Sequence, residues 1–299
     1  MASLATLDRP TPVLRGASTP RRWRWRRFAS NRLSLLGLAM LAVLVVAALA
    51  GPIVTSRYLD LHPNTLSCLS LEGPSTSHPF GCDPLGRDIL ARLLVGGRVS
   101  LAVGLLVAVC TTVLGLLVGL ASGYLGGLVD SLLMRFTDTM LAMPTFFIVL
   151  AAAAFLGPSL FNTIVIIGLT QWMVTARLIR GECLAIREKE FVLAARVSGQ
   201  TDLGVMRHIL LNVVSTVIVV ATLAVATGIL TESALSYLGL GIQPPQASWG
   251  SMLSNANNYI FVAPMQGVYP GLLIVLTVLA VNFVGEGLRE ALDPRLAGR

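Results

Sequence analysis

The chain has 299 residues, of which 55% are hydrophobic and only 12% are charged. A soluble domain carries about 25% charged residues, so this composition excludes an ordinary soluble protein and predicts one embedded in a lipid bilayer. The net charge is +7, but eight arginines are concentrated in residues 1–32, ahead of the first apolar run, which favours contact with a membrane surface over nucleic-acid binding.

Hydropathy predicts an all-α polytopic membrane protein with six transmembrane helices, each long enough to cross about 30 Å of hydrocarbon. In chain order we expect a basic tail at 1–32, a first span at 33–54, a polar loop at 55–98, a core at 99–288 and a C-terminal tail at 289–299. Within the core, the spans are expected at 99–120, 132–156, 160–179, 213–235 and 268–288, with a central loop at 180–211 and a second polar loop at 236–266.

Glycine and proline predict how two of these spans behave. Gly115, Gly119 and Gly123 recur every four residues. Small residues at this spacing let helix backbones approach closely in lipid, so we expect a tight helix contact on this face. Residues 122–127 are expected to form a turn, and Pro144 is expected to bend the span that contains it.

The distribution of arginine and lysine predicts the orientation of the spans. Basic residues gather in the 1–32 tail, the central loop and the C-terminus, whereas none lies between Glu232 and Glu286. By the positive-inside rule, both termini and the central loop are expected in the cytoplasm, and the two polar loops outside. The first polar loop runs against this rule because it carries four arginines, a conflict that neighbouring acids soften: Arg57, Arg87, Arg92 and Arg98.

A polar stretch at 190–212, within and just beyond the central loop, predicts two short helices with a break between them. The first helix has a small apolar face with charged neighbours: Leu193, Ala194, Ala195 and Val197, beside Glu190 and Arg196. Gly199 is expected to end this helix in the left-handed conformation, and Thr201 with Asp202 to cap the next one.

The spacing of Ala194-Ala195, Gly199 and Ile209 resembles the cytoplasmic EAA loop of ABC importer permeases, which docks on an ATPase subunit. Leu193 departs from the family pattern, which has Glu there, and Leu211 stands where the family has Pro. The resemblance implies a coupling surface formed by Glu190, Leu193, Ala194, Ala195, Arg196, Gly199, Asp202 and Ile209. An ordinary cytoplasmic loop is the alternative.

The first polar loop carries a second resemblance. Residues 78–92 read HPFGCDPLGRDILAR and resemble the HPFGTDxxGRDxxSR segment of the peptide and nickel subgroup of these permeases. Its charges alternate in sign along the chain: Asp83, Arg87, Asp88 and Arg92. We expect a structural salt-bridge cluster rather than direct substrate contact, with Asp88 and Arg92 paired one helical turn apart.

The same loop contains two cysteines. Cys82 stands where the subgroup has Thr, and Cys68 precedes it. Outside the cytoplasm such a pair is expected to oxidise to a disulfide, the alternative being two free thiols. Cys110 and Cys183 lie in or beside the membrane and are expected to be free.

Residues 239–250 (GLGIQPPQASWG) and 287–296 (GLREALDPRL) resemble the same subgroup, with Glu290 in place of an Asp. The resemblance implies a type I ABC importer permease of a prokaryotic cell membrane, working with a second homologous permease chain, two ATPase subunits and an external substrate-binding protein. It implies dipeptides or oligopeptides as cargo, with nickel or another small solute as the alternative. Candidate residues of the translocation path are Asp138, Gln171, Gln243 and Trp249. For Asp138 and Gln171 a packing role is favoured over a path role.

No catalytic, cofactor or metal site is expected in this chain. A P-loop needs a lysine followed by Ser or Thr, but the only lysine, Lys189, lies between Glu188 and Glu190. ATP and Mg are therefore expected on partner chains alone. An ion-driven carrier is disfavoured because the acids in the spans lie near their ends. A membrane scaffold without transport activity is the alternative from another functional class.

Overall fold

The computed structural model describes residues 28–292, and all regular secondary structure in this range is helical. The helices are α2 (Arg32–Tyr58), α3 (Ile89–Leu125), α4 (Gly127–Ala142), α5 (Thr145–Leu156), α6 (Leu160–Thr170), α7 (Trp172–Arg187), α8 (Glu190–Val197), α9 (Asp202–Tyr237), α10 (Trp249–Asn257) and α11 (Met265–Leu292). Most of the predicted basic tail and the end of the C-terminal tail lie outside the described residues.

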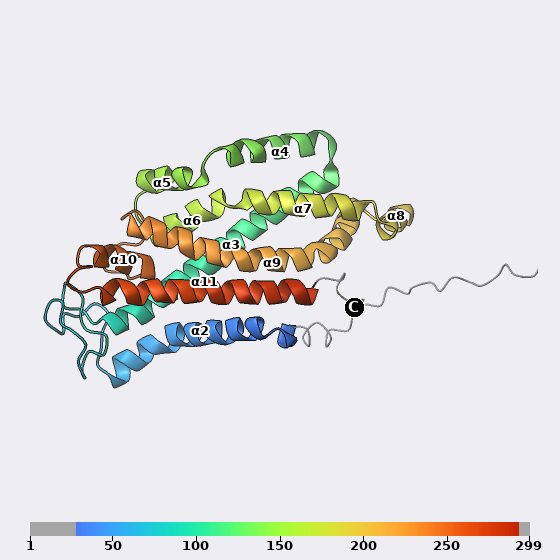
Figure 1. The fold of residues 1–299 in the computed structure, drawn as a ribbon. Helices are drawn as coiled ribbons and strands as arrows, with labels where there is room; N and C mark the ends of the chain where they lie inside the picture. The colour runs from blue at the N-terminus through green and yellow to red at the C-terminus, as the bar shows by residue number, and fades with distance from the viewer. Residues whose placement is uncertain (1–27, 293–299) are drawn as a thin grey trace, which may run out of the picture.

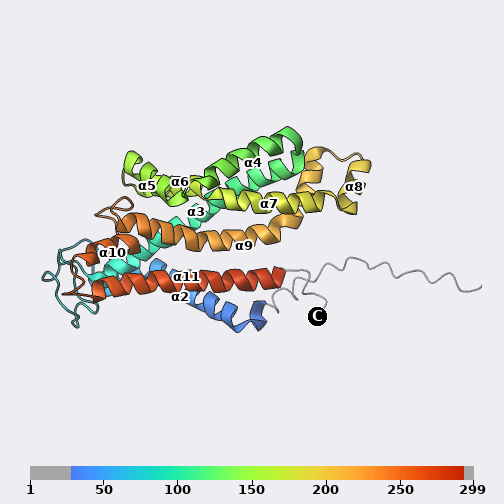
Figure 2. The same cartoon turned by 45° about the horizontal axis from the view of Figure 1, so that its top comes forward.

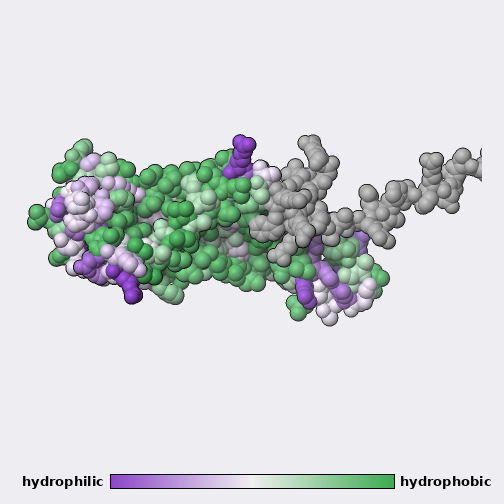
Figure 3. All heavy atoms as spheres, turned by 90° about the horizontal axis from the view of Figure 1, so that it is seen from below, coloured by the Kyte–Doolittle hydropathy of each residue, from purple (hydrophilic) through white to green (hydrophobic). Residues whose placement is uncertain are grey.

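The helices form an elongated bundle with the composition of a membrane protein. Within residues 28–292, five helical segments are long and apolar enough to cross a membrane, and α4 with α5 makes a sixth when this bent pair counts as one span. The start of α2, helix α8 and the end of α11 lie at one end of the bundle, while α10 lies at the other (Figure 1). Hydrophobic residues dominate the middle of the face in Figure 3, and hydrophilic residues gather toward its ends.

The predicted third span is interrupted, which corrects the expectation of one bent helix over 132–156. Helices α4 and α5 meet at 83° across Met143 and Pro144. Proline disfavours helical geometry in the residue before it, and Met143 accordingly has φ −88° and ψ 136°. The bend at Pro144 is therefore confirmed, but it ends one helix and begins another.

The helices at the fourth predicted span and the central loop extend beyond the limits that hydropathy sets for a membrane-crossing segment. Gln171 separates α6 from α7, and α7 continues to Arg187, well past the predicted end at 179. Helix α8 and the start of α9 occupy most of the predicted loop at 180–211. Hydropathy marks only the segment suited to hydrocarbon, whereas a helix continues into polar sequence for as long as its backbone hydrogen bonds are made.

Helix α3 extends beyond its predicted end, and a short helix that was not predicted, α10, lies in the second polar loop. Helix α3 continues to Leu125, so the predicted turn at 122–127 is reduced to a sharp change of direction at Gly126, with φ 67°. Helix α10 lies within the second polar loop, where Ser248 and Ser251 form a reciprocal capping box at its start. The serine pair that caps α10 is visible in the local sequence. Hydropathy alone did not predict the helix, because it is too polar to be a span.

Helix α3 lies at the centre of the bundle, where it packs against α2, α6, α7 and α9. Figures 1 and 2 show it running obliquely past α7 and α9. A Cβ added to Gly115 would lie 2.5 Å from the Cβ of Thr175, and one added to Gly119 would lie 2.6 Å from the carbonyl oxygen of Ala176. The predicted glycine face is thus confirmed as the contact of α3 with α7.

We expect Gly119→Val to destabilise the protein by about 1–3 kcal/mol, because no side chain fits between α3 and the backbone of α7 at this point. Gly181→Val is the matched control, since nothing lies within 4 Å of a Cβ added to this helical glycine. Thermal unfolding in detergent measures the difference. Equal losses of Tm in the two variants would contradict the role of Gly119.

Candidate functional site

Helix α8 begins and ends as its sequence predicts. It spans Glu190–Val197 and ends before Gly199, whose φ of 75° lies in the left-handed region that glycine adopts without steric cost. Thr201 then caps α9 by accepting a hydrogen bond from the N–H of Gly204 at 3.3 Å. The second predicted short helix is instead the first part of α9, which continues unbroken to Tyr237.

One face of α8 packs against α9. Val192 is fully buried in a cluster that includes Val205 and Ile209. Ala195, three residues after Val192 and on the same helix face, packs partly against this cluster. Ile209, and in part Ala195, are therefore turned away from the coupling surface to which the sequence assigned them, and they hold α8 on the bundle instead.

The opposite face of α8 is apolar and exposed. Phe191, Leu193 and Ala194 are exposed, and Val197 is 90% exposed. Leu203, at the start of α9, is also exposed. No other described part of the chain covers these side chains, so α8 offers a small hydrophobic surface at this end of the bundle.

Polar contacts tie α8 and α9 to the end of α3. The hydroxyl of Tyr124 donates to Oδ1 of Asp202 at 2.5 Å, and the guanidinium of Arg196 lies 5.6 Å from the centre of the Tyr124 ring. Arg187 donates from Nη1 to the carbonyl oxygen of Gly123 at 3.1 Å. These side chains line a hollow of about 700 Å³ beside α8. The sequence prediction included Arg196 and Asp202 but missed Tyr124 and Arg187, for which no motif provided a signal.

A second cavity, of about 570 Å³, lies between the spans. Gln171 lines it at the break between α6 and α7, and its Nε2 donates to Oγ1 of Thr231 at 2.9 Å. Other hydroxyl-bearing residues line the same cavity: Thr111, Thr145, Thr170, Thr175 and Thr227. The rest of the lining is apolar and includes Leu141, Leu178 and Val220. The break between α6 and α7 thus brings the Gln171 side chain to a cavity between the spans.

The other three candidate path residues lie outside this cavity. Asp138 pairs with Arg177 at an exposed position between α4 and α7. Gln243 is exposed and donates to the carbonyl oxygen of Gly239 at 2.7 Å. Trp249 is buried, and its indole N–H donates to the carbonyl oxygen of Leu93 at 3.0 Å. In this conformation all three side chains make structural contacts within the chain.

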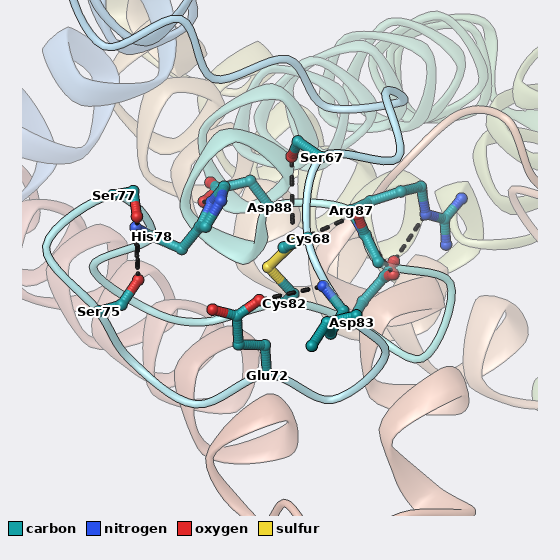
Figure 4. The surroundings of a disulfide bond; sticks show 12 residues. Ser67, Cys68, Glu72, Ser75, Ser77, His78, Cys82, Asp83, Arg87 and Asp88 are labelled. Atoms are coloured by element: carbon teal, nitrogen blue, oxygen red, sulfur yellow. Dashed lines mark hydrogen bonds and ion pairs between the residues drawn. A yellow bond between two sulfur atoms is a disulfide. The ribbon is translucent and has the colours of Figure 1, made fainter.

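The charge cluster of the first polar loop is ordered differently from the prediction (Figure 4). Asp83 accepts from Nε of Arg87 at 2.7 Å and lies 3.5 Å from Nε of Arg92. Asp88 does not pair with Arg92; instead it caps α3 by accepting from the N–H of Ala91 at 2.7 Å. The i,i+4 spacing was misleading because Asp88 lies at the N-cap, where the helix backbone competes for its carboxylate.

The first polar loop contains the disulfide Cys68–Cys82, with Cα atoms 6.4 Å apart, whereas Cys110 and Cys183 are free. The carbonyl oxygen of Cys82 accepts from Nε2 of Gln266, at the start of α11, at 3.2 Å. The cross-linked loop is thereby attached to the last span.

A buried carboxyl group joins the second polar loop to the spans. Glu232, on α9, is fully buried and accepts from the hydroxyl of Ser236 at 2.7 Å, while Ser100 Oγ of α3 lies 3.5 Å from it. Ser100 also accepts from the N–H of Trp249, and Ser236 accepts from that of Ile242. The sequence placed Glu232 near the end of a span but gave no sign of this network.

We expect Glu232→Ala to lower stability by about 1–3 kcal/mol, because it removes an acceptor from buried hydroxyl groups. Glu232→Gln, which retains one acceptor oxygen, should cause a smaller loss. Thermal unfolding of both variants in detergent tests this order. A larger loss for Gln than for Ala would show that Glu232 does not act as an acceptor for the serine network.

Comparison with known proteins identifies the family. Residues 101–298 match the binding-protein-dependent transport system inner membrane component family, and residues 19–69 match the N-terminal TM domain of oligopeptide transport permease C. The chain is 38% identical to the dipeptide transport system permease protein DppC of Alkalihalophilus pseudofirmus, over 94% of this chain and 91% of that protein. It is also 38% identical to the glutathione transport system permease protein GsiD of Pectobacterium atrosepticum, over 99% and 97% of the two chains, and to the oligopeptide transport system permease protein OppC of Bacillus subtilis, over 90% and 88%. The chain therefore belongs to the inner membrane components of binding-protein-dependent transport systems, as a multi-pass permease subunit of an ABC importer.

Proposed function

We propose that this permease imports dipeptides or oligopeptides delivered by an external substrate-binding protein. It works with a second homologous permease chain and with two ATPase subunits, which hold the ATP and Mg that this chain does not bind. The names of the relatives support a peptide cargo, since they include dipeptide, oligopeptide and glutathione permeases.

The lining of the cavity at Gln171 is the observation that favours a peptide over nickel. Its polar groups are hydroxyls and one amide, and none of its lining residues is His, Cys, Asp or Glu. Hydroxyl and amide groups both donate and accept, as peptide N–H and C=O groups require. Nickel is bound well by imidazole, which this lining lacks.

Uptake by the reconstituted complex tests the cargo. We expect ATP-dependent accumulation of labelled di- and oligopeptides, but not of radioactive nickel, in vesicles supplied with the substrate-binding protein. Binding protein loaded with nickel serves as the comparison. Nickel uptake without peptide uptake would support the small-solute alternative, and no uptake of either would support a scaffold.

In this importer the α8 end of the bundle faces the cytoplasm, where the ATPase subunits lie. Basic residues are frequent at this end, in agreement with the positive-inside rule; they include Arg180, Arg187, Lys189, Arg196 and Arg207. The exposed apolar face of α8 then meets a groove of an ATPase subunit, as a short helix with small and apolar side chains can. This orientation leaves the Cys68–Cys82 loop on the outer side.

The contacts of α8 explain how a movement of the ATPases would reach the cavity. Val192 and Ala195 attach α8 to α9, and the bond of Tyr124 to Asp202 attaches the start of α9 to α3. Helix α9 also carries Thr231, which contacts Gln171 in the cavity. ATP binding and loaded binding protein would favour different arrangements of these helices, which is the requirement for coupled transport.

We expect Val197→Asp to lower peptide uptake at least tenfold and to weaken co-purification of the ATPase, because it puts an unpaired charge into a mostly apolar contact. Leu193→Glu, which restores the residue usual in the family, should be tolerated. Val197 is exposed in the chain itself, so folding should be unaffected. Ala195→Asp is a poorer test because Ala195 also packs against α9.

Leu66→Asp is the matched control, since Leu66 is an exposed apolar residue at the opposite end of the bundle. It should leave ATPase co-purification unchanged. Full uptake by Val197→Asp at normal membrane levels would contradict the coupling role of α8.

A further inference from the structure

Three metal-ligating side chains meet in the first polar loop. The Sγ atoms of Cys68 and Cys82 and a ring nitrogen of His78 all lie within 4.8 Å of one another. His78 and Cys82 are buried, and Cys68 is half-buried. Figure 4 shows the disulfide in the middle of the loop, with His78 on one side of it and Asp83 on the other.

Asp88 orients the imidazole of His78 through its Nδ1 atom. The Asp88 carboxylate is fully buried, and its Oδ2 lies 3.0 Å from Nδ1 of His78. A carboxylate accepts, so this contact keeps the proton on Nδ1 and leaves the lone pair of Nε2 free. A histidine whose second nitrogen is held by a carboxylate is the usual arrangement of a zinc-bound imidazole.

We propose that the loop binds a zinc ion when its two cysteines are reduced, through Sγ of Cys68, Sγ of Cys82 and Nε2 of His78. Zinc takes cysteine and histidine ligands in tetrahedral sites, and a water molecule completes a site with three protein ligands. Soft thiolate ligands favour zinc over magnesium or calcium. The same residues would thus form a disulfide in the oxidised protein and a metal site in the reduced one.

The redox step requires a dithiol reductant. Two electrons and two protons pass from the reductant to the disulfide, the S–S bond breaks, and the reductant becomes a disulfide. Zinc then displaces the two thiol protons, and the metal binds both thiolates. The cysteine Cα atoms, 6.4 Å apart, need little movement, because the two sulfurs of a tetrahedral site lie about 3.8 Å apart at Zn–S distances of about 2.3 Å.

The backbone around the cluster is held independently of the S–S bond. The N–H groups of Ser67 and Cys82 donate to the carbonyl oxygens of Gly86 and Glu72, each at 2.9 Å. The carbonyl oxygen of Cys82 is held by Gln266. The carbonyl oxygen of His78 likewise accepts from the N–H groups of Ser75 and Gly81, each at 2.9 Å. These bonds do not depend on the disulfide and would keep the three ligands near one another after reduction.

The full-length chain in detergent tests the proposal. After reduction with a phosphine and removal of the reductant, zinc should protect Cys68 and Cys82 from alkylation, with one zinc bound per chain, and EDTA should reverse the protection. Mass mapping reads each cysteine separately, so Cys110 and Cys183 are internal references. Cobalt in place of zinc should give a thiolate-to-metal charge-transfer band.

His78→Gln is the diagnostic variant, because glutamine can still donate to Asp88 but is a poor zinc ligand. It should bind zinc at least tenfold more weakly than the natural chain, since even residues that only orient a ligand contribute tenfold or more. Thr76→Ala, a change at an exposed neighbour, should bind normally. Recovery of the disulfide on reoxidation checks that the variant loop is intact.

Zinc protection that is equal in His78→Gln and in the natural chain would overturn the proposal, since two thiolates alone would then account for it. The absence of a cobalt charge-transfer band in the reduced natural chain would overturn it whatever the behaviour of the variant. Zinc bound by the oxidised protein at the same affinity would show that the cysteines are not the ligands.

Discussion

The close approach of α3 to its neighbours is the constraint on which the bundle depends. Apolar side chains gain nothing by leaving lipid for one another, so helices in a membrane are held by tight packing and by polar contacts. Gly115 and Gly119 bring α3 against α7, and Gly104 brings it against Ile229 of α9. These contacts position both sides of the cavity between the spans, which Gln171 lines on one side and Thr231 on the other.

The polar contacts lie at the ends and at the breaks of this packed frame. Glu232 and its serine partners attach the second polar loop at one end, while Tyr124 and Asp202 attach the start of α9 at the other. Between them, the break at Gln171 interrupts a span and gives its amide access to the cavity. The frame thus combines tightly packed helices with polar contacts at their ends and at the break at Gln171.

The sequence predicted features that depend on neighbouring residues. Gly199 and Thr201 end and start helices through interactions within a few residues, and Pro144 acts on the residue before it, so all three could be read directly. The glycine spacing of α3 was also sufficient to predict a close helix contact. Hydropathy predicted six spans, and residues 28–292 contain five helical segments long and apolar enough to cross a membrane, or six if the bent pair α4 and α5 counts as one. The family resemblance is confirmed by the comparisons.

The sequence did not predict which residues far apart in the chain would contact one another. Tyr124 and Asp202 are 78 positions apart, and Gln171 and Thr231 are 60 apart, so no pattern within one segment could pair them. Asp83 and Asp88 have similar neighbours, yet one takes both arginines and the other caps a helix and contacts His78. That division depends on where α3 begins, at Ile89, ten residues before the predicted start of the second span.

The unbroken course of α9 has a mechanical consequence. Its 36 residues correspond to a rod of about 54 Å, with α8 attached at one end and Glu232 near the other. A rod of that length tilted by about 5° around one end moves its other end by about 5 Å. Because α9 is one continuous helix that carries both the contact with α8 and Thr231 of the cavity, a tilt of a few degrees would displace one of its ends by a distance comparable to the width of a peptide backbone.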